Sequence, residues 1–110
     1  MLRTKKQEKV ICKDCPIAKT ANLIGDSCTL IIIRDLLSGA KRFGDLEKSL
    51  NGVSTRTLTK KLEILVAKDL IERTEIIGKP PRVEYSLTEK GKGLHALTEA
   101  MHDYGEKHLM

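Results

Sequence analysis

A mostly helical fold with one small β-hairpin is predicted by three features of the sequence. Apolar residues recur at helical spacing in successive segments that are separated by capping or turn residues. Two runs rich in β-branched residues flank the Gly/Pro segment 78–82, which is typical of a hairpin. The chain has 110 residues, no internal repeat and no linker, so we expect a single domain over residues 1–110.

The composition narrows the class of protein. Apolar residues make up 40% of the chain, with one Phe, two Tyr and no Trp, so the core must be aliphatic. A core of this size is marginal unless the chain oligomerises. No apolar run reaches the ~18 residues that cross a bilayer, and the charged N-terminus lacks the apolar stretch of a signal peptide. We therefore expect a cytoplasmic protein that does not contact membranes, with its three cysteines present as thiols.

The first helix is expected to begin at Cys15-Pro16 and to run to about Leu23. Asp14 can cap its N-terminus, and Pro16 suits a first turn because the missing N–H costs nothing there. The helix is expected to stop near Gly25.

The second helix is expected over residues 28–37, with Asp26 and Ser27 as cap candidates and Gly39 after its end. The three consecutive isoleucines in this segment are equally compatible with a buried strand. A helix is favoured because apolar residues fall at i, i+3 and i+7, namely Leu30, Ile33 and Leu37.

A helix-turn-helix arrangement follows. A short amphipathic helix over residues 43–50 leads to an Asn51-Gly52 turn, and Ser54 caps a longer helix that we expect over about 55–68. The buried face of this longer helix is formed by Leu58, Leu62 and Leu65. At about 100° per residue, the opposite face carries polar and mostly cationic side chains: Arg56, Lys60 and Glu63, flanked by Thr57 and Thr59.

The C-terminal part of the chain is expected to form the hairpin and a last helix. Lys79 and Arg82 flank Pro80-Pro81 at the hairpin tip, which makes a stiff cationic finger. The helix is expected from Thr88 onward, with a heptad seam at Leu94, Leu97, Met101, Tyr104 and His108. Because so short a chain offers this seam no other obvious partner, we expect a dimer interface at Leu94, Leu97, Met101 and Tyr104.

The net charge of +5 is unevenly distributed. Residues 1–20 and 41–61 are rich in Lys and Arg, whereas residues 94–110 carry more acids than bases. A localised basic surplus is typical of nucleic-acid binding, but a cationic face can also be mere solvated surface. The order of the helices along the chain distinguishes a nucleic-acid-binding face from a solvated surface.

A helix, a tight turn, a capped basic helix and a hairpin with a basic tip form the plan of a winged helix-turn-helix. In that arrangement the second helix of the motif enters the major groove of DNA. Helix N-terminal groups can hold a phosphate, Arg can read guanine edges, and the hairpin can lie along the backbone or minor groove. The alternative is a helical adaptor whose basic face is only solvated. The expected DNA-binding residues are Arg42, Ser54, Thr55, Arg56, Thr57, Thr59, Lys60, Lys79 and Arg82.

Four motifs carry a resemblance to a known family. They are the Cys15-Pro16 opening, the Arg42-Phe43 step into the third helix, the run 54–62, and PPRVEYSLTEKG in the wing and its exit. Together, over residues from about 12 to 105, they resemble the HxlR family of bacterial and archaeal transcriptional regulators. The resemblance implies a homodimeric winged helix that binds palindromic double-stranded DNA operators and dimerises through its first and last helices. Cys28 departs from the family, which usually carries Trp there, so packing at this core position must differ.

The cysteines raise the question of thiol chemistry. Cys15 lies at a predicted helix N-terminus beside Lys13, and both features stabilise a thiolate. The resemblance implies a sensor of oxidants or electrophiles at this position, while the alternative is a small packing residue at the dimer interface. Cys12 completes a C-x-x-C pair, which suits either a redox pair or zinc. Structural zinc needs four ligands and the histidines lie on the distant last helix, so we expect no metal and no cofactor.

These observations predict a sequence-specific DNA-binding regulator of transcription and not an enzyme, since the length argues against a deep catalytic cleft. The regulator is expected to be a homodimer on a palindromic operator, with Cys15 and Cys12 as redox-sensing candidates and an oxidant or small molecule as effector. The alternative is a small thiol-redox or metal-sensing protein whose basic surface is incidental. Salt dependence distinguishes the two, because phosphate contacts make affinity for duplex DNA fall steeply with salt.

Overall fold

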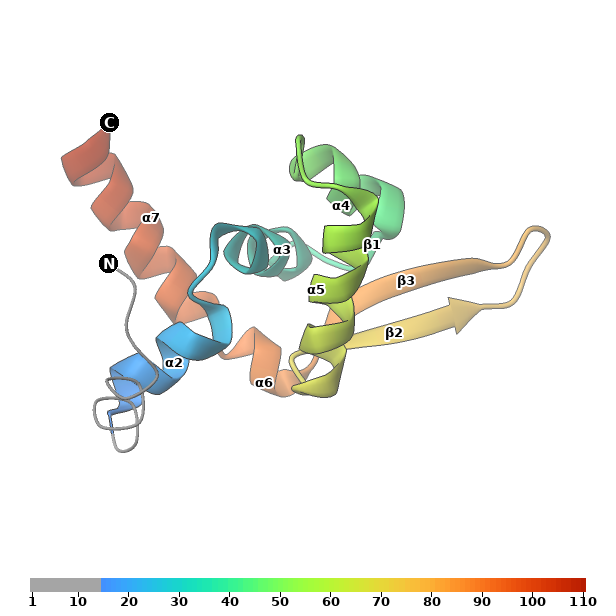
Figure 1. Ribbon diagram of the computed structural model, residues 1–110, viewed down its shortest axis with the longest axis horizontal. Coiled ribbons are helices and arrows are strands. Elements are labelled where there is room, and N and C mark those ends of the chain that lie inside the picture. Colours follow the sequence, from blue (N-terminus) through green and yellow to red (C-terminus); the bar gives the residue numbers. More distant parts are fainter. Residues whose placement is uncertain (1–14) are drawn as a thin grey trace.

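The computed structural model describes residues 15–110, and the predicted fold class is confirmed: helices dominate and one small antiparallel sheet is present (Figure 1). The elements in chain order are α2 (Pro16–Ile24), α3 (Ser27–Leu37), β1 (Lys41–Arg42), α4 (Phe43–Ser49), α5 (Thr55–Ala67), β2 (Ile71–Ile76), β3 (Arg82–Leu87), α6 (Glu89–Lys92) and α7 (His95–Leu109). Within residues 15–110, no helix combines the length and the apolar composition needed to cross a bilayer.

Helix starts follow the predicted capping residues. The Asp26 carboxylate accepts a hydrogen bond from the backbone N–H of Thr29 at 2.8 Å and so caps α3. Ser54 Oγ accepts one from the backbone N–H of Thr57 at 3.1 Å and caps α5. Each cap satisfies a backbone donor that has no partner inside its helix. Both caps were expected from the sequence and are confirmed.

The start of α2 falls at the predicted Cys15-Pro16 step. Cys15 occupies the N-cap position, where its side chain makes no capping hydrogen bond. Pro16 takes the first helical position, as its missing N–H favours. Asp14, the expected cap, lies outside the described residues.

The predicted hairpin is part of a larger sheet. Its strands β2 and β3 pair from Ile71 opposite Leu87 to Ile76 opposite Arg82, and β1 adds to the other edge of β3. Strand β1 places Arg42 opposite Glu84. The prediction of a two-stranded hairpin was incomplete because a two-residue strand is too short to show a periodic pattern.

The core is aliphatic, as the composition predicts, and α3 runs through its centre. Ile32 and Ile33 are fully buried in it. The buried face of α3 is shifted from the predicted stripe, because Leu30 and Leu37 are only partly buried whereas Leu36 is buried. The remaining buried members of the cluster come from α2, α4, α5, β2 and β3 and from the residues directly after α4 and before β2: Ile24, Leu46, Leu50, Leu58, Leu62, Leu65, Leu70, Ile71 and Leu87.

The last helix is not continuous from Thr88, as the sequence predicted. A short α6 ends before Gly93, and α7 begins at His95. Gly91 within α6 is buried so closely against the Leu70 carbonyl that a Cβ atom there would overlap it. This contact anchors α6 beside Leu70, the residue before β2, and the chain then turns before α7 continues as a separate helix.

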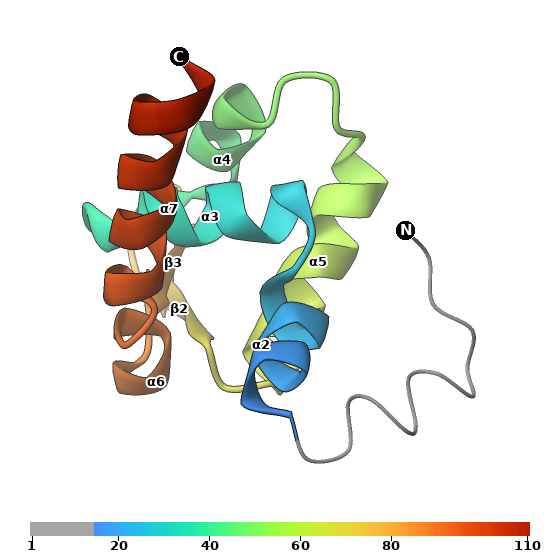
Figure 2. The ribbon, with the colours of Figure 1, turned by 90° about the vertical axis from the view of Figure 1, so that its left-hand side faces the viewer.

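The hairpin and α7 project toward opposite ends of the molecule's 51 Å long axis (Figure 1). Strands β2 and β3 extend past α4 and α5, so the turn between them stands away from the helical body. At the other end, α7 packs across α3 (Figure 2). The helix-turn-helix pair α4–α5 lies between these two projections.

Candidate nucleic-acid interface

Helix α5 separates an apolar face from a polar face as the sequence predicted. Leu58, Leu62 and Leu65 are at most 2% exposed and hold the helix on the core. Arg56 and Lys60 are exposed on the other side. The predicted neighbours Thr57, Thr59 and Glu63 are exposed as well. The sequence therefore assigned every predicted residue of α5 to the correct side of the helix.

The hydroxyl groups at the start of α5 already make hydrogen bonds within the protein. Ser54 Oγ lies 3.0 Å from Thr57 Oγ1, and the Thr55 hydroxyl donates to Glu47 Oε2 of α4 at 2.9 Å. The Thr59 hydroxyl donates to the Thr55 carbonyl at 2.8 Å. These bonds close the first turn of α5 and fix it to α4, so a phosphate at Ser54 or Thr55 would have to displace them. Arg56 and Lys60 remain as the long donors of this face.

Lys61, which is not among the predicted DNA-binding residues, fixes α5 to the start of α3. Its ammonium lies 3.2 Å from Asp26 Oδ2. Burial alone would raise the pKa of Asp26, but hydrogen bonds from Thr29 and Lys61 outweigh burial and lower that pKa overall. The two residues are 35 positions apart, and no local pattern in the sequence connects them.

The sheet brings Arg42 next to the wing, which is the hairpin formed by β2, β3 and the turn between them. A cleft of about 410 Å³ is lined by Arg42, Ile76, Ile77, Gly78, Lys79, Pro80 and Arg82. Three predicted cations, Arg42 before α4 and Lys79 and Arg82 in the wing, therefore share one surface. Arg82 is the first residue of β3 and not part of the turn, and its Nε lies 3.4 Å from Glu84 Oε2. The sequence predicted these cations separately, and strand β1 unites them.

Of the two cysteines predicted to sense oxidants, Cys15 is among the residues that the structure describes and Cys12 is not. Cys15 is partly exposed at the N-cap of α2, and Cys12 lies outside the described residues. Cys28, expected to be core, is only partly buried; burial and the nearby Asp26 carboxylate raise the pKa of its thiol. Between Cys15 and the C-terminus, no group of three or more His, Cys, Asp or Glu side chains could hold a metal ion.

The expected dimer seam divides into two parts. Leu94 and Leu97 are partly buried and pack against the chain's own core, so the expectation that they lack a partner within the chain was wrong. Met101 and Tyr104 are 48% and 61% exposed, and the Tyr104 ring lies 4.7 Å from the His108 ring. The reason is the packing of α7 on α3, which covers the first turn of the seam and leaves the later turns uncovered.

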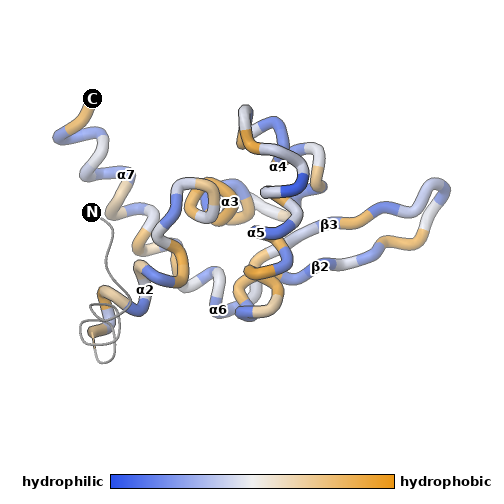
Figure 3. The backbone as a smooth tube through the Cα atoms, in the orientation of Figure 1, coloured by the Kyte–Doolittle hydropathy of each residue, from blue (hydrophilic) through white to orange (hydrophobic). Residues whose placement is uncertain are grey.

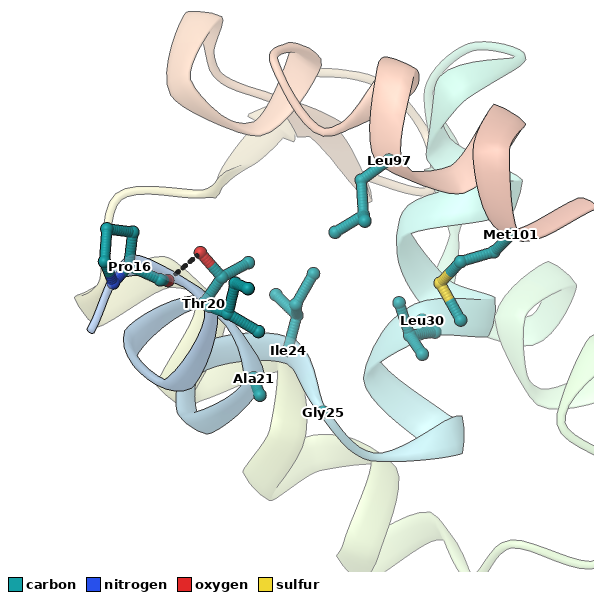
Figure 4. Close-up of a pocket in the computed structure, with 9 residues that line it drawn as sticks. Pro16, Thr20, Ala21, Ile24, Gly25, Leu30, Leu97 and Met101 are labelled. Carbon is teal, nitrogen blue, oxygen red and sulfur yellow. Dashed lines mark hydrogen bonds between the residues drawn. The ribbon is translucent and has the colours of Figure 1, made fainter. Parts of the chain in front are cut away.

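An apolar groove lies where this exposed part of α7 faces α2 (Figure 4). Its volume is about 440 Å³, and its lining comes from α2, the α2–α3 turn, α3 and α7: Pro16, Ile17, Thr20, Ala21, Ile24, Gly25, Leu30, Leu97 and Met101. Ile17 is 81% exposed at its edge. Ile17 is not among the residues that the sequence predicted for the dimer interface. An isoleucine at the second position of an amphipathic helix, outside its buried stripe, is the pattern that indicates such a residue.

Comparisons with known proteins agree with this geometry. The HxlR-like helix-turn-helix family matches residues 23–110. An uncharacterized HTH-type transcriptional regulator of Synechocystis is 38% identical over 95 residues, which cover 86% of this chain and 70% of that protein. A structure from Porphyromonas gingivalis assigned to the MarR family of transcriptional regulators has a TM-score of 0.81 at 28% identity, covering 99% of both chains.

A redox regulator is also among the similar structures. HypR in its oxidized form has a TM-score of 0.81 at 32% identity, covering 87% of this chain and 99% of that chain. Its reduced form has a TM-score of 0.80 at the same identity, covering 84% and 92%. With a capped basic helix, a hairpin wing beside it and a family match over most of its length, the chain belongs to the HxlR-like helix-turn-helix family of DNA-binding transcriptional regulators.

Proposed function

We propose that the protein regulates transcription as a homodimer on a palindromic operator, with α5 of each protomer in the major groove. The observation that carries this proposal is the exposed face of α5, where Arg56 and Lys60 project opposite the buried leucines. A guanidinium on such a helix can read the O6 and N7 atoms of guanine, and an ammonium can contact guanine or phosphate. The bonds that close the N-terminus of α5 hold these two side chains on a rigid support.

The wing adds contacts outside the major groove. Arg42, Lys79 and Arg82 line one cleft at the hairpin, which supports phosphate or minor-groove contacts beside the groove that α5 enters. Glu84 lies among them and pairs with Arg82, so Lys79 and Arg42 are the stronger candidates for phosphate. Such contacts position the protein on the duplex and make its affinity depend on salt.

The dimer is supported by the uncovered apolar surface around α7. Ile17 of α2 and Met101 and Tyr104 of α7 are exposed at or beside the groove between these helices, and both helices lie at the opposite end of the long axis from the hairpin (Figure 1). A second copy related by a two-fold axis would cover this surface and space the two α5 helices by about 34 Å, one turn of DNA.

A thiol response is the finer part of the proposal. Cys15 is next to Pro16 and Ile17, which line the same groove, so chemistry at Cys15 would act at the dimer surface. A peroxide can oxidise the thiolate to a sulfenic acid, and condensation with a second thiol then forms a disulfide and releases water. The added bulk or crosslink would rotate the protomers and move the two α5 helices out of register with DNA. The similarity to HypR in its two redox forms supports this idea.

Selection of bound sequences from random duplex DNA tests the proposal. We expect a palindromic site, and an affinity that falls steeply as salt increases. Limited peroxide should weaken binding by the wild type and by Cys28→Ser but not by Cys15→Ser. Selection without an enriched palindrome would contradict the operator model, and equal loss of binding by Cys15→Ser would contradict the role of Cys15. Thiol chemistry in a protein that binds no duplex would instead favour a sensor with an incidental basic surface.

A further inference from the structure

The turn of the hairpin carries an isoleucine without any cover. Ile77 is 100% exposed, while its neighbour Ile76 is only partly exposed at the end of β2. Single exposed apolar residues are common on protein surfaces. Ile77 differs in its location, because it is the first residue after β2 and so begins the turn of a hairpin that projects from the helical body; at this end of the hairpin a hydrophobic segment meets a polar turn (Figure 3).

The surroundings of Ile77 are cationic and stiff. Lys79 follows two residues later and is exposed, and two consecutive prolines, Pro80 and Pro81, separate it from Arg82. Arg42 reaches the same cleft from β1. The DNA minor groove offers matching chemistry: phosphates line its two edges, and apolar sugar and base surfaces form its interior. A purely apolar protein surface would offer no anionic group to Lys79, Arg82 and Arg42. The combination of cations with one apolar side chain therefore favours DNA as the partner.

The sheet presents this cluster as a unit. Residues directly opposite each other in an antiparallel ladder share a face, and so do residues two apart on one strand. Ile76 lies opposite Arg82, and Arg42 lies opposite Glu84, two residues from Arg82. Ile76, Arg82, Glu84 and Arg42 therefore project from one face of the sheet, and Ile77 lines the same cleft as Ile76, Arg82 and Arg42. The ladder is paired up to Ile76, so Ile77 is the first residue beyond a fixed strand end.

We propose that Ile77 is an apolar wedge that enters the minor groove of the operator, partly unstacks one base step and bends the duplex. This proposal rests on the proposed function, because α5 in the major groove would bring the wing to an adjacent minor groove. Lys79 and Arg42 would hold the phosphates on either side while the isoleucine side chain inserts. Pyrimidine–purine steps unstack most easily, so the operator should carry such a step where the wing lies.

Bending of a selected duplex tests the proposal directly. The probe is the operator from the random-sequence selection, with a donor and an acceptor dye at its ends and 2-aminopurine at the wing step. Wild-type protein should shorten the end-to-end distance and increase 2-aminopurine fluorescence, because that base is no longer stacked. Ile77→Thr keeps a β-branched residue in the turn but is polar, and it should lose most of both signals. Its affinity should fall by only about 3- to 10-fold, because the cost of unstacking disappears together with the contact.

Matched variants separate the wedge from a general effect on the hairpin. Ile77→Leu keeps an apolar side chain and should retain the bend. Arg73→Lys keeps the charge of an exposed residue on the opposite face of β2 from Ile76 and should behave as wild type. All three variants should melt at the wild-type temperature because both positions are exposed. Equal bending by wild type and Ile77→Thr would overturn the wedge while leaving the regulator proposal intact. Failure of the wild type to bind any selected duplex would overturn both. Binding without bending, with loss of a protein partner in Ile77→Thr, would assign the tip to a protein interface instead.

Discussion

The ammonium of Lys61 in α5 lies 3.2 Å from the carboxylate of Asp26, the residue that caps α3. The same carboxylate accepts hydrogen bonds from both the backbone N–H and the hydroxyl of Thr29, each at 2.8 Å. The Asp26 side chain therefore both caps α3 and holds α5, the predicted DNA-contacting helix, in place. Gly25 in that turn lines the apolar groove, so the contact lies between the proposed dimer surface and the proposed DNA surface.

Removing this carboxylate should destabilise the protein. Asp26→Ala loses the cap and the ion pair, and we expect about 1 kcal/mol less stability toward urea. Lys61→Met removes only the partly exposed ion pair and should lose under about 1 kcal/mol. Equal losses for the two variants would mean that the cap contributes nothing.

Acid should remove the contribution of Asp26. Its pKa is lowered in the folded protein, so its stabilising effect is complete above the unfolded value of ~3.9 and disappears as pH falls through the folded value. Urea unfolding between neutral pH and pH ~3 should therefore show a smaller loss for Asp26→Asn, which cannot ionise, than for wild type. A loss as large in Asp26→Asn would assign the acid sensitivity to other carboxyl groups.

Arg56 should provide base specificity. Its exposed position on α5 predicts that Arg56→Ala loses about 1–3 kcal/mol of operator affinity and relaxes the preference at one base pair. Lys92→Ala removes an exposed cation on α6, which meets the C-terminal end of α5 and so lies at the opposite end of that helix from Arg56, and this variant should bind as wild type. Fluorescence anisotropy with operators mutated one position at a time measures both effects. Unchanged selectivity in Arg56→Ala would mean that α5 docks in another orientation.

The wing cations should act through phosphate. Neutralising Lys79 and Arg82 together should weaken binding to all sequences about equally and reduce the slope of log affinity against log salt by about 2. A reduction near 1 would fit the pairing of Arg82 with Glu84, which leaves Lys79 as the main phosphate contact. An unchanged slope would show that these two side chains do not contact phosphate.

The exposed part of α7 should hold the dimer together. Tyr104→Asp places a charge on a residue that is 61% exposed, so we expect folded monomers, whereas Leu97→Asp would also disrupt the chain's own core. Sedimentation velocity and circular dichroism distinguish dissociation from unfolding. A wild-type protein that sediments as a monomer at micromolar concentration would contradict the interface.

The sequence by itself determined the elements that depend on neighbours along the chain. Caps at Asp26 and Ser54, the leucine face of α5 and the hairpin around Pro80-Pro81 all follow from local rules of hydrogen bonding, helical period and turn geometry. These rules were enough to predict the order of the helices and which side of α5 carries Arg56.

Tertiary structure alone decided the features that join distant residues. The pairing of β1 with β3 placed Arg42 beside the wing, and the ion pair between Lys61 and Asp26 connected α5 to α3. Packing on α3 covered Leu97 but left Tyr104 exposed, although both lie on one heptad seam. The physical reason is that periodicity describes which side chains share a face of one helix, whereas burial and pairing depend on which other element meets that face.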